Sequence, residues 1–104
     1  MNEKIFRMIG LACRAGKVEV GEAKTEDRLR HKKSKLVIIS NDASYNTREK
    51  FSDLCAKNGV VMISIGDRET LGNYTGRDFA VVLSLSNEGF AKRIRELAEE
   101  TGNL

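Results

Sequence analysis

The 104-residue sequence has few of the side chains from which most catalytic and metal centres are built. Its two cysteines, Cys13 and Cys55, stand far apart and outside any CxxC arrangement, so we expect reduced thiols and neither a disulfide scaffold nor a zinc site. Its only histidine, His31, lies beside Lys32 and Lys33, where a solvated or anion-facing side chain is expected rather than a catalytic base. We therefore expect no metal and no cofactor. The chain also has no proline, an absence that supports no functional conclusion.

Long hydrophobic runs are missing too. Glu3, Lys4 and Arg7 interrupt the N-terminal segment, which is therefore neither a signal peptide nor a membrane span, and no later segment is apolar enough to cross a membrane. Hydrophobic residues make up 40% of the chain and charged residues 32%, unlike the composition of disordered proteins. We expect a single domain over residues 1–104, monomeric when free and located in the cytoplasm.

The net charge of +3 is unevenly distributed along the chain. Residues 1–50 contain 12 Lys and Arg against 7 Asp and Glu, whereas residues 51–104 contain 6 against 8. This asymmetry favours a basic face that binds a polyanion such as nucleic acid, although clusters of solvated surface charge look the same in a sequence.

The spacing of apolar residues predicts helices that alternate with buried strands. We expect four strands, over 17–20, 36–39, 60–65 and 79–85. A helix ending near Gly16 precedes the first strand, and a surface helix over about 21–31 follows it. A helix begun by Ser44 follows the second strand, a short helix over 68–74 between Asp67 and Gly76 follows the third, and a C-terminal helix capped by Ser86 or Asn87 follows the fourth. The three later strands are continuous apolar runs, typical of strands buried on both faces. The expected fold class is α/β, a three-layer α/β/α sandwich with a small, largely parallel or mixed sheet.

Two segments, residues 10–18 and 41–47, partly resemble loops found in catalytic sites. Residues 10–18 differ from a phosphate-binding loop because five residues separate Gly10 from Gly16, Val18 replaces the magnesium-binding Ser or Thr, and a helix precedes the segment instead of a strand. The turn over 41–47 follows a strand, where ligands of open sheets gather. Turn and capping chemistry is nevertheless favoured there over catalysis, because a receiver or phosphatase site needs further acids and a lysine nearby. We therefore expect no enzyme.

The surface helix after Gly21 carries the stronger signal. At 100° per residue, one quadrant of this helix holds Lys24, Arg28, His31 and Lys32, and the opposite side holds Glu22, Glu26, Arg30 and Lys33. The first set predicts a basic face, flanked by Arg14, Lys17 and Lys35, and the start of the helix adds backbone donors suited to phosphate. The alternative is a solvated helix with many Glu–Lys pairs.

Several segments together resemble one family, the ribosomal proteins called L-seven-Ae and L-thirty-e. They are the run over residues 16–21, Lys24 and Thr25 after it, the run over 35–42, and Leu71–Gly72 followed by Gly76. The segments over 10–12 and 14–17, with those over 42–44 and 46–47, are most similar to a small bacterial, YlxQ-like branch. The resemblance covers nearly the whole chain in the correct order.

This resemblance implies an RNA-binding ribonucleoprotein component of the translation machinery, associated with the ribosome or with kink-turns, in which an internal loop bends beside sheared G·A pairs. It implies that the start of the second helix (21–28) enters the kinked groove and that the loop over 77–79 packs against an extruded base. The candidate RNA-binding residues are Lys17, Gly21, Lys24, Thr25, Arg28, Lys32, Asp42, Asn46, Arg77, Asp78 and Phe79.

The sequence departs from the family pattern at the contact positions. Ala23, Lys24 and Asp27 stand where kink-turn binders usually carry Asn or Lys, then Glu or Gln, then Lys, and Arg77 and Phe79 replace aliphatic residues. Phosphate contacts position a protein whereas base contacts specify, so RNA binding is expected to survive these changes better than kink-turn specificity. Two alternatives stay open: a protein-interaction module that kept the fold with little RNA affinity, and a small phosphate-sensing α/β domain that uses the turn over 41–47.

Overall fold

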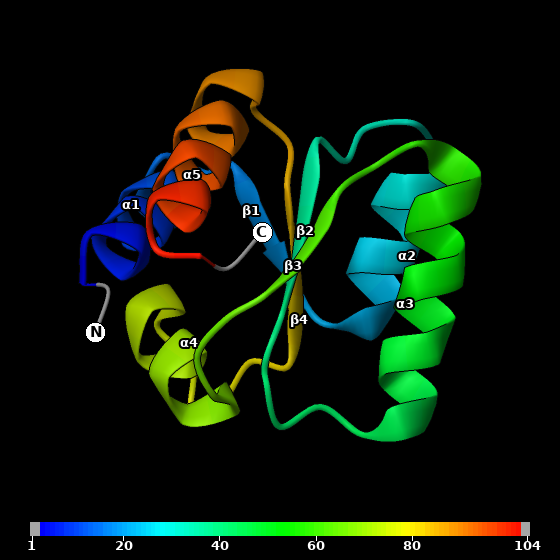
Figure 1. Cartoon of the computed structure of the whole chain (residues 1–104), viewed down its shortest axis with the longest axis horizontal. Helices are drawn as coiled ribbons and strands as arrows, with labels where there is room; N and C mark the ends of the chain where they lie inside the picture. Colours follow the sequence, from blue (N-terminus) through cyan, green and yellow to red (C-terminus); the bar gives the residue numbers. More distant parts are fainter. Residues whose placement is uncertain (1–2, 103–104) are drawn as a thin grey trace.

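The computed structural model describes residues 3–102, which form five helices and four strands (Figure 1). The elements are α1 (Glu3–Arg14), β1 (Val18–Val20), α2 (Glu22–Arg30), β2 (Leu36–Ile39), α3 (Tyr45–Asn58), β3 (Met62–Ser64), α4 (Arg68–Thr75), β4 (Val82–Leu85) and α5 (Glu88–Glu100). Helices α1, α4 and α5 cover one face of the sheet, and α2 and α3 cover the other. The predicted three-layer α/β/α sandwich is confirmed.

The sheet is mixed, with the strand order β1-β4-β2-β3. Strand β4 runs antiparallel to both of its neighbours, so that Val20 lies opposite Leu83 and Ile39 lies opposite Val82. Only β2 and β3 are parallel. The start of β4 therefore lies at the same end of the sheet as the ends of β1 and β2.

Strand β2 carries the core on both of its faces. Leu36 and Ile38 pack with the α1, α4 and α5 layer, whereas Val37 and Ile39 pack with Phe51 under α2 and α3. All four strand residues are fully buried, as the continuous apolar run predicts.

Capping side chains begin three of the helices at the residues that the sequence indicates. Ser44 accepts the Thr47 amide hydrogen at 3.1 Å, and Asp67 accepts that of Thr70 at 2.7 Å. The Asn87 side chain caps α5 through the Phe90 amide, which decides between the two predicted caps.

Two predicted strands are shorter than expected. The apolar run over 60–65 forms a strand only at Met62–Ser64, because it lies at the sheet edge, and Val61 is 39% exposed. The run over 79–85 becomes a strand only at Val82, and Phe79 is 61% exposed in the loop before it. The first residue of each run, Val60 or Phe79, is therefore not buried on both faces.

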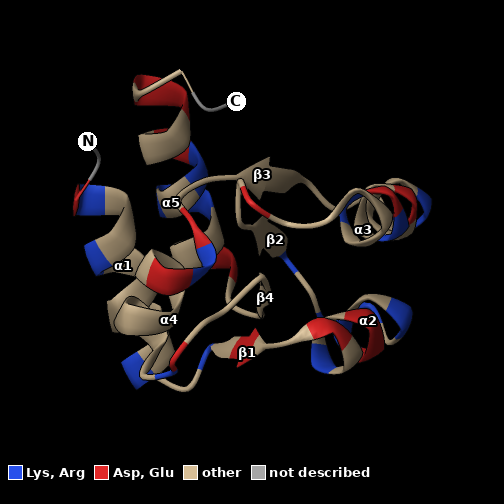
Figure 2. Cartoon of the chain, turned by 90° about the horizontal axis from the view of Figure 1, so that it is seen from below, with Lys and Arg blue, Asp and Glu red and all other residues tan. Residues whose placement is uncertain are grey.

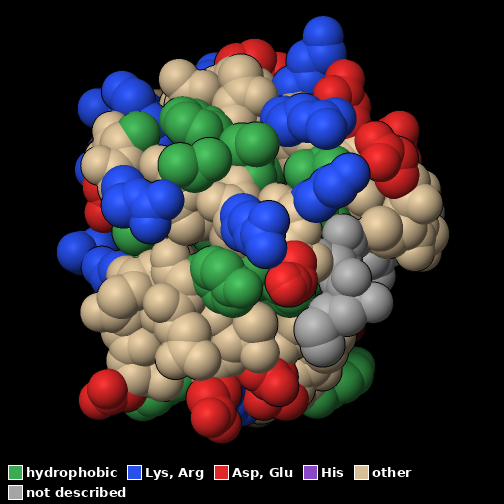
Figure 3. Space-filling view, turned by 90° about the vertical axis from the view of Figure 1, so that its left-hand side faces the viewer, with side chains coloured by type: hydrophobic (Ala, Val, Ile, Leu, Met, Phe, Trp, Pro, Cys, Tyr) green, Lys and Arg blue, Asp and Glu red, His purple; other side chains and the backbone are tan. Residues whose placement is uncertain are grey.

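The outer surface of the α1, α4 and α5 layer combines hydrophobic and basic side chains (Figure 3). Leu11 of α1 is 46% exposed there, on the side of the helix away from the buried Ile5 and Ile9. Within residues 3–102, no helix has the length and apolar character needed to cross a membrane.

Two valines provide a matched test of this core. Val82 is fully buried at the centre of the sheet, and Val61 lies half-exposed at its edge. We expect Val82→Ala to lower the free energy of unfolding by about 2 kcal/mol, through lost burial and a residual cavity, and Val61→Ala to lower it by less than about 0.5 kcal/mol. Urea denaturation of both variants measures the difference, and equal midpoints would show that β4 is not central.

Candidate nucleic-acid interface

Four segments that are distant in sequence meet at one end of the sheet, the lower end in Figure 1. The Gly21 amide donates to the Val82 carbonyl at 2.9 Å, and the Ser40 amide donates to the Val81 carbonyl at 2.8 Å. The Asn41 amide donates to the Gly66 carbonyl at 2.7 Å. We call the surface formed by residues 21–23, 41–47, 66–69 and 77–80 the Gly21 end.

Gly21 makes the turn from β1 into α2. Its φ of 114° lies in the left-handed region, which other residues rarely adopt, and an added Cβ would meet no atom within 4 Å. Backbone conformation, rather than space, therefore requires glycine at this position.

An ion pair joins the turn after β2 to the start of α4. The Arg68 guanidinium donates to the Asp42 carboxylate at 3.3 Å and to the Asp42 carbonyl at 2.8 Å, and the Arg68 amide donates to the same carboxylate at 3.2 Å. Asp42 thus holds Arg68 at the surface, and the carboxylate that the sequence suggests as an RNA contact is already occupied.

The loop over 77–79 packs directly against α4 because Gly72 has no side chain. A Cβ at Gly72 would lie 2.6 Å from the Phe79 Cα and 2.8 Å from the Arg77 carbonyl oxygen. The Arg77 amide donates to the Gly72 carbonyl at 2.9 Å, which fixes the loop further. The Phe79 ring remains exposed.

A shallow pocket of about 420 Å³ opens beside this loop. Its lining residues are Arg68, Glu69, Asn73, Arg77, Asp78 and Phe79. An exposed ring next to guanidinium groups is the combination on which unstacked RNA bases pack. The Arg77 guanidinium is held by the Thr75 carbonyl at 2.7 Å.

The predicted basic face of α2 is largely neutralised by the protein itself. Glu19 of β1 lies 3.3 Å from the Arg28 guanidinium and 4.0 Å from the Lys24 ammonium. Asp27 contacts Arg28 at 3.8 Å and His31 at 3.1 Å. Figure 2 shows acidic and basic residues alternating on α2. Lys24 and Arg28 thus lie together as the predicted basic face requires, but part of their charge is cancelled. Glu19 belongs to a neighbouring strand, which a helical projection omits, and Asp27 belongs to α2 itself.

The opposite side of α2 pairs with α3. Glu26 contacts Lys50 at 3.0 Å and also contacts Arg30, whose hydrogen bond lowers the pKa of the Glu26 carboxyl. The Thr47 hydroxyl donates to Glu22 at 3.3 Å. These contacts fix the start of α3 beside α2.

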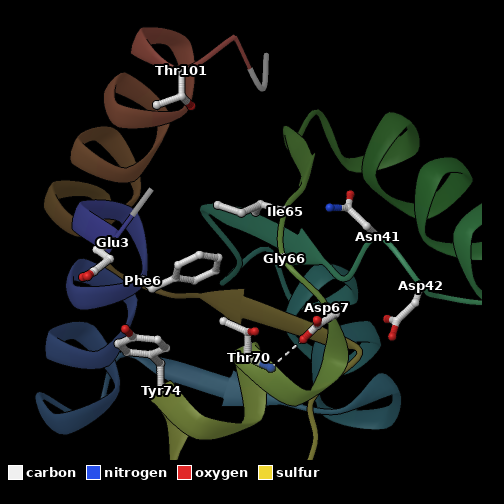
Figure 4. Close-up of a pocket in the computed structure, with 10 residues that line it drawn as sticks. All are labelled: Glu3, Phe6, Asn41, Asp42, Ile65, Gly66, Asp67, Thr70, Tyr74 and Thr101. Carbon is white, nitrogen blue, oxygen red and sulfur yellow. Dashed lines mark hydrogen bonds between the residues drawn. The ribbon is translucent and has the colours of Figure 1, made fainter. Parts of the chain in front are cut away.

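A larger pocket lies between α1 and α4 and extends to the Gly21 end through Asn41, Asp42, Gly66 and Asp67 (Figure 4). Its volume is about 860 Å³, and its lining residues are Glu3, Phe6, Asn41, Asp42, Ile65, Gly66, Asp67, Thr70, Tyr74 and Thr101. The rings of Phe6 and Tyr74 stack with centroids 5.5 Å apart. The hydrogen bond from the Thr70 amide lowers the pKa of Asp67, which stays ionised. With three carboxylates and no Lys or Arg in its lining, this pocket does not suit phosphate.

The sequence matches the Ribosomal protein L7Ae/L30e/S12e/Gadd45 family over residues 3–94. The chain belongs to this family. It is 35% identical over 94 residues to the RNA-binding protein YlxQ of Bacillus subtilis (strain 168), a match that covers 90% of this chain and 94% of that protein. It is also 35% identical over 97 residues to the RNA-binding protein YlxQ of Enterococcus faecium, with 93% of each chain covered.

Two solved structures share the fold. A protein of unknown function from Bacillus halodurans C superposes with a TM-score of 0.90 at 29% identity, covering 92% of this chain and 97% of that one. The Giardia lamblia 15.5kD RNA binding protein superposes with a TM-score of 0.80 at 18% identity, covering 98% and 91%. The family resemblance predicted from the sequence is confirmed.

The L7Ae-family fold brings some of the predicted contacts together and separates others. Gly21, Asn46 and residues 77–79 lie at the Gly21 end, and Lys24 and Arg28 lie along α2 beside it. Thr25 is fully buried on the side of α2 that faces the sheet, so the prediction of a surface contact there is wrong.

Lys17 and Lys32 lie at the other end of the domain. Lys17 precedes β1, where its carbonyl accepts the Ser86 amide hydrogen at 3.0 Å, and Lys32 follows the C-terminal end of α2. The Lys32 ammonium donates to the Asn58 side chain at 2.8 Å. These two lysines do not share a surface with Gly21.

Sequence reasoning does not single out Arg68. It lies 26 residues from Asp42, and no local pattern pairs the two. The only sequence signal was its position in the first turn of a short helix, immediately after the Asp67 cap.

The close approach at Gly72 generates a test. Alanine has a higher helix propensity than glycine, but the added Cβ of Gly72→Ala would push the loop over 77–79 away from α4. We expect the variant to lose about 1–3 kcal/mol of stability through overpacking, measured by urea denaturation. A variant as stable as the wild type would show that the loop does not depend on this contact.

Proposed function

We propose that this protein binds structured RNA at the Gly21 end and has no catalytic role. The observation that carries the proposal is the hydrogen bonding of Val81 and Val82 to Ser40 and Gly21, which gathers the start of α2, the turn over 41–47 and the loop over 77–79 on one surface. Its curated relatives are named RNA-binding proteins, which supports the same conclusion.

The chemistry of this surface suits a sharply bent RNA. The start of α2 offers backbone N–H groups without a side-chain cap, and oriented donors of this kind favour crowded phosphates. Phe79 beside Arg68 and Arg77 offers a platform for a base that has left the helical stack. We propose a kink-turn or a similar bent element, in ribosomal or other cytoplasmic RNA, as the ligand.

The contributions of α2 and of the loop over 77–79 to RNA binding differ from those that the sequence indicates. Glu19 and Asp27 compete with phosphates for Lys24 and Arg28, so α2 contributes less electrostatic affinity than its cations suggest. Arg77 is held by a carbonyl and retains its charge toward solvent. We therefore assign most of the discrimination between bent and regular RNA to the loop over 77–79.

Removing the Phe79 ring tests this assignment. The ring is 61% exposed, so Phe79→Ala should leave the fold unchanged. We expect it to weaken binding to a kink-turn RNA by about 1–3 kcal/mol, or roughly 5- to 150-fold in Kd, because one base loses its stacking partner. Fluorescence anisotropy at fixed salt measures both proteins.

The matched controls are Phe79→Tyr, which keeps the ring and should bind like the wild type, and an unkinked duplex, on which Phe79→Ala should have little effect. Wild-type affinity of Phe79→Ala for the kink-turn would contradict the assignment.

A second variant tests the departures at Ala23 and Asp27. Ala23 is exposed and has no group that can hydrogen-bond a base, and Asp27 adds a negative charge one turn further along α2. Because a base contact contributes about 1–3 kcal/mol in comparable recognition, we expect Ala23→Asn with Asp27→Lys to raise kink-turn affinity roughly tenfold or more. On the duplex, the gain should be modest and should vanish at high salt. Equal gains on both RNAs would show that only charge had changed.

A further inference from the structure

We propose that the end of the domain opposite the Gly21 end is a second RNA-backbone site, which binds the phosphates of a stem of the RNA held at the Gly21 end. Its cations are Lys17, Lys32, Lys33, Lys35 and Arg95, and we call this surface the lysine end. The inference rests on the proposed function, but none of its residues belongs to the Gly21 end.

The sheet and a pocket bring four of these residues together, and Lys33 lies between Lys32 and Lys35 in the chain. The Lys35 amide donates to the Leu85 carbonyl at 2.7 Å, and the next residue, Ser86, donates to the Lys17 carbonyl, so the two lysines flank the end of β4. A pocket of about 290 Å³ is lined by Lys32, Lys35 and Arg95. Glu88 is the one acidic residue in that lining.

The cations at the two ends differ in their partners. At or beside the Gly21 end, four cations lie within 4.0 Å of a carboxylate: Lys24, Arg28, Lys50 and Arg68. Arg48 and Arg77 there donate to carbonyl oxygens instead. In contrast, Lys17, Lys33, Lys35 and Arg95 make no ion pair with any carboxylate of residues 3–102. The protein leaves its charge available at the lysine end, where a polyanion gains most from it.

The backbone of the turn over 31–35 is fixed. The amides of Lys33 and Ser34 both donate to the Arg28 carbonyl, at 2.8 and 3.3 Å, and the buried Ser84 hydroxyl donates to that of Ser34 at 2.7 Å. Lys32 has φ 60°, and it is the one non-glycine residue in 3–102 with a positive φ. A position that favours glycine thus carries a lysine.

The chemistry of the lysine end favours phosphates over a protein partner. Among its neighbours only Val61 is an exposed large hydrophobic residue, and no aromatic ring lines the pocket. A surface of flexible cations without apolar anchors contacts the backbone of nucleic acid and reads no bases. Helix α2, about 13 Å long from nine residues at roughly 1.5 Å each, separates the two ends, a span that a bent RNA with two stems can bridge.

The test compares two kink-turn RNAs, one with long stems and one with stems trimmed to the bent core. The variant is Lys33→Gln with Lys35→Gln and Arg95→Gln, and the readout is the slope of log affinity against log salt. Each lost phosphate contact makes the slope shallower by about 0.7–0.9, so we expect a change of roughly 2 to 3 on the long-stem RNA. On the trimmed RNA, the variant should match the wild type.

A triple variant with the same loss of charge serves as the control. Lys4 and Arg7 are exposed on α1 and Arg93 is exposed on α5, so Lys4→Gln with Arg7→Gln and Arg93→Gln should leave both slopes unchanged. Lys32→Gly separates a binding role from a structural one. Relief of the backbone strain should raise its Tm by a few degrees, while its affinity for the long-stem RNA falls.

The outcomes distinguish the two proposals. If the wild type fails to bind the trimmed RNA, the proposed function is wrong and the second site falls with it. The second outcome is that the wild type binds both RNAs and the triple variant at Lys33, Lys35 and Arg95 has the wild-type slope on each. The lysine end then does not bind RNA, and its unpaired cations contact a protein partner instead. Equal losses on both RNAs would also overturn the proposal, because no stem would then be involved.

Discussion

The carbonyl groups at the start of β4 hold the candidate interface together. Val82 accepts the Gly21 amide hydrogen on one side, and Val81 accepts the Ser40 amide hydrogen on the other. Because β4 lies between β1 and β2 and runs antiparallel to both, these bonds form only at the end where β1 and β2 finish. Three segments separated by up to 61 positions, from Gly21 to Val82, thereby become neighbours, and each other feature of the Gly21 end is attached to this frame.

The ion pairs on α2 matter for ligand binding more than for stability. Exposed pairs such as Lys24 with Glu19 contribute little to folding, about 0–1 kcal/mol each. The same carboxylates lie where phosphates would approach, so they lower the electrostatic attraction of α2 for any polyanion. An RNA must then be selected by shape and by the loop over 77–79, whereas the lysine end adds affinity without selecting a sequence.

Local patterns in the sequence were enough to predict most of the elements. The caps at Ser44 and Asn87, the short helix after Asp67 and the buried run over 36–39 depend on neighbours within a few residues, and each is confirmed. The strands over 60–65 and 79–85 were predicted too long, because edge position and the packing of a preceding loop depend on the whole sheet.

The candidate site was harder to predict for the same reason. Glu19 lies on β1 and forms an ion pair with Arg28 of α2, and Asp42 forms one with Arg68, 26 positions further along the chain. The helical projection placed Lys32 on the same face as Lys24, yet Lys32 lies one helix length away from the start of α2. The two lysines therefore belong to different surfaces of the domain.

The most direct test of the account is an NMR titration of the 15N-labelled protein with a kink-turn RNA whose stems are trimmed to the bent core. If RNA binds at the Gly21 end, the amide resonances of residues 21–23, 41–47, 66–69 and 77–82 shift or broaden first, and those of residues 32–35 and of the outer surface of α1 do not. Perturbations confined to α1 and α5, with the Val81 and Val82 amides unchanged, would contradict the account.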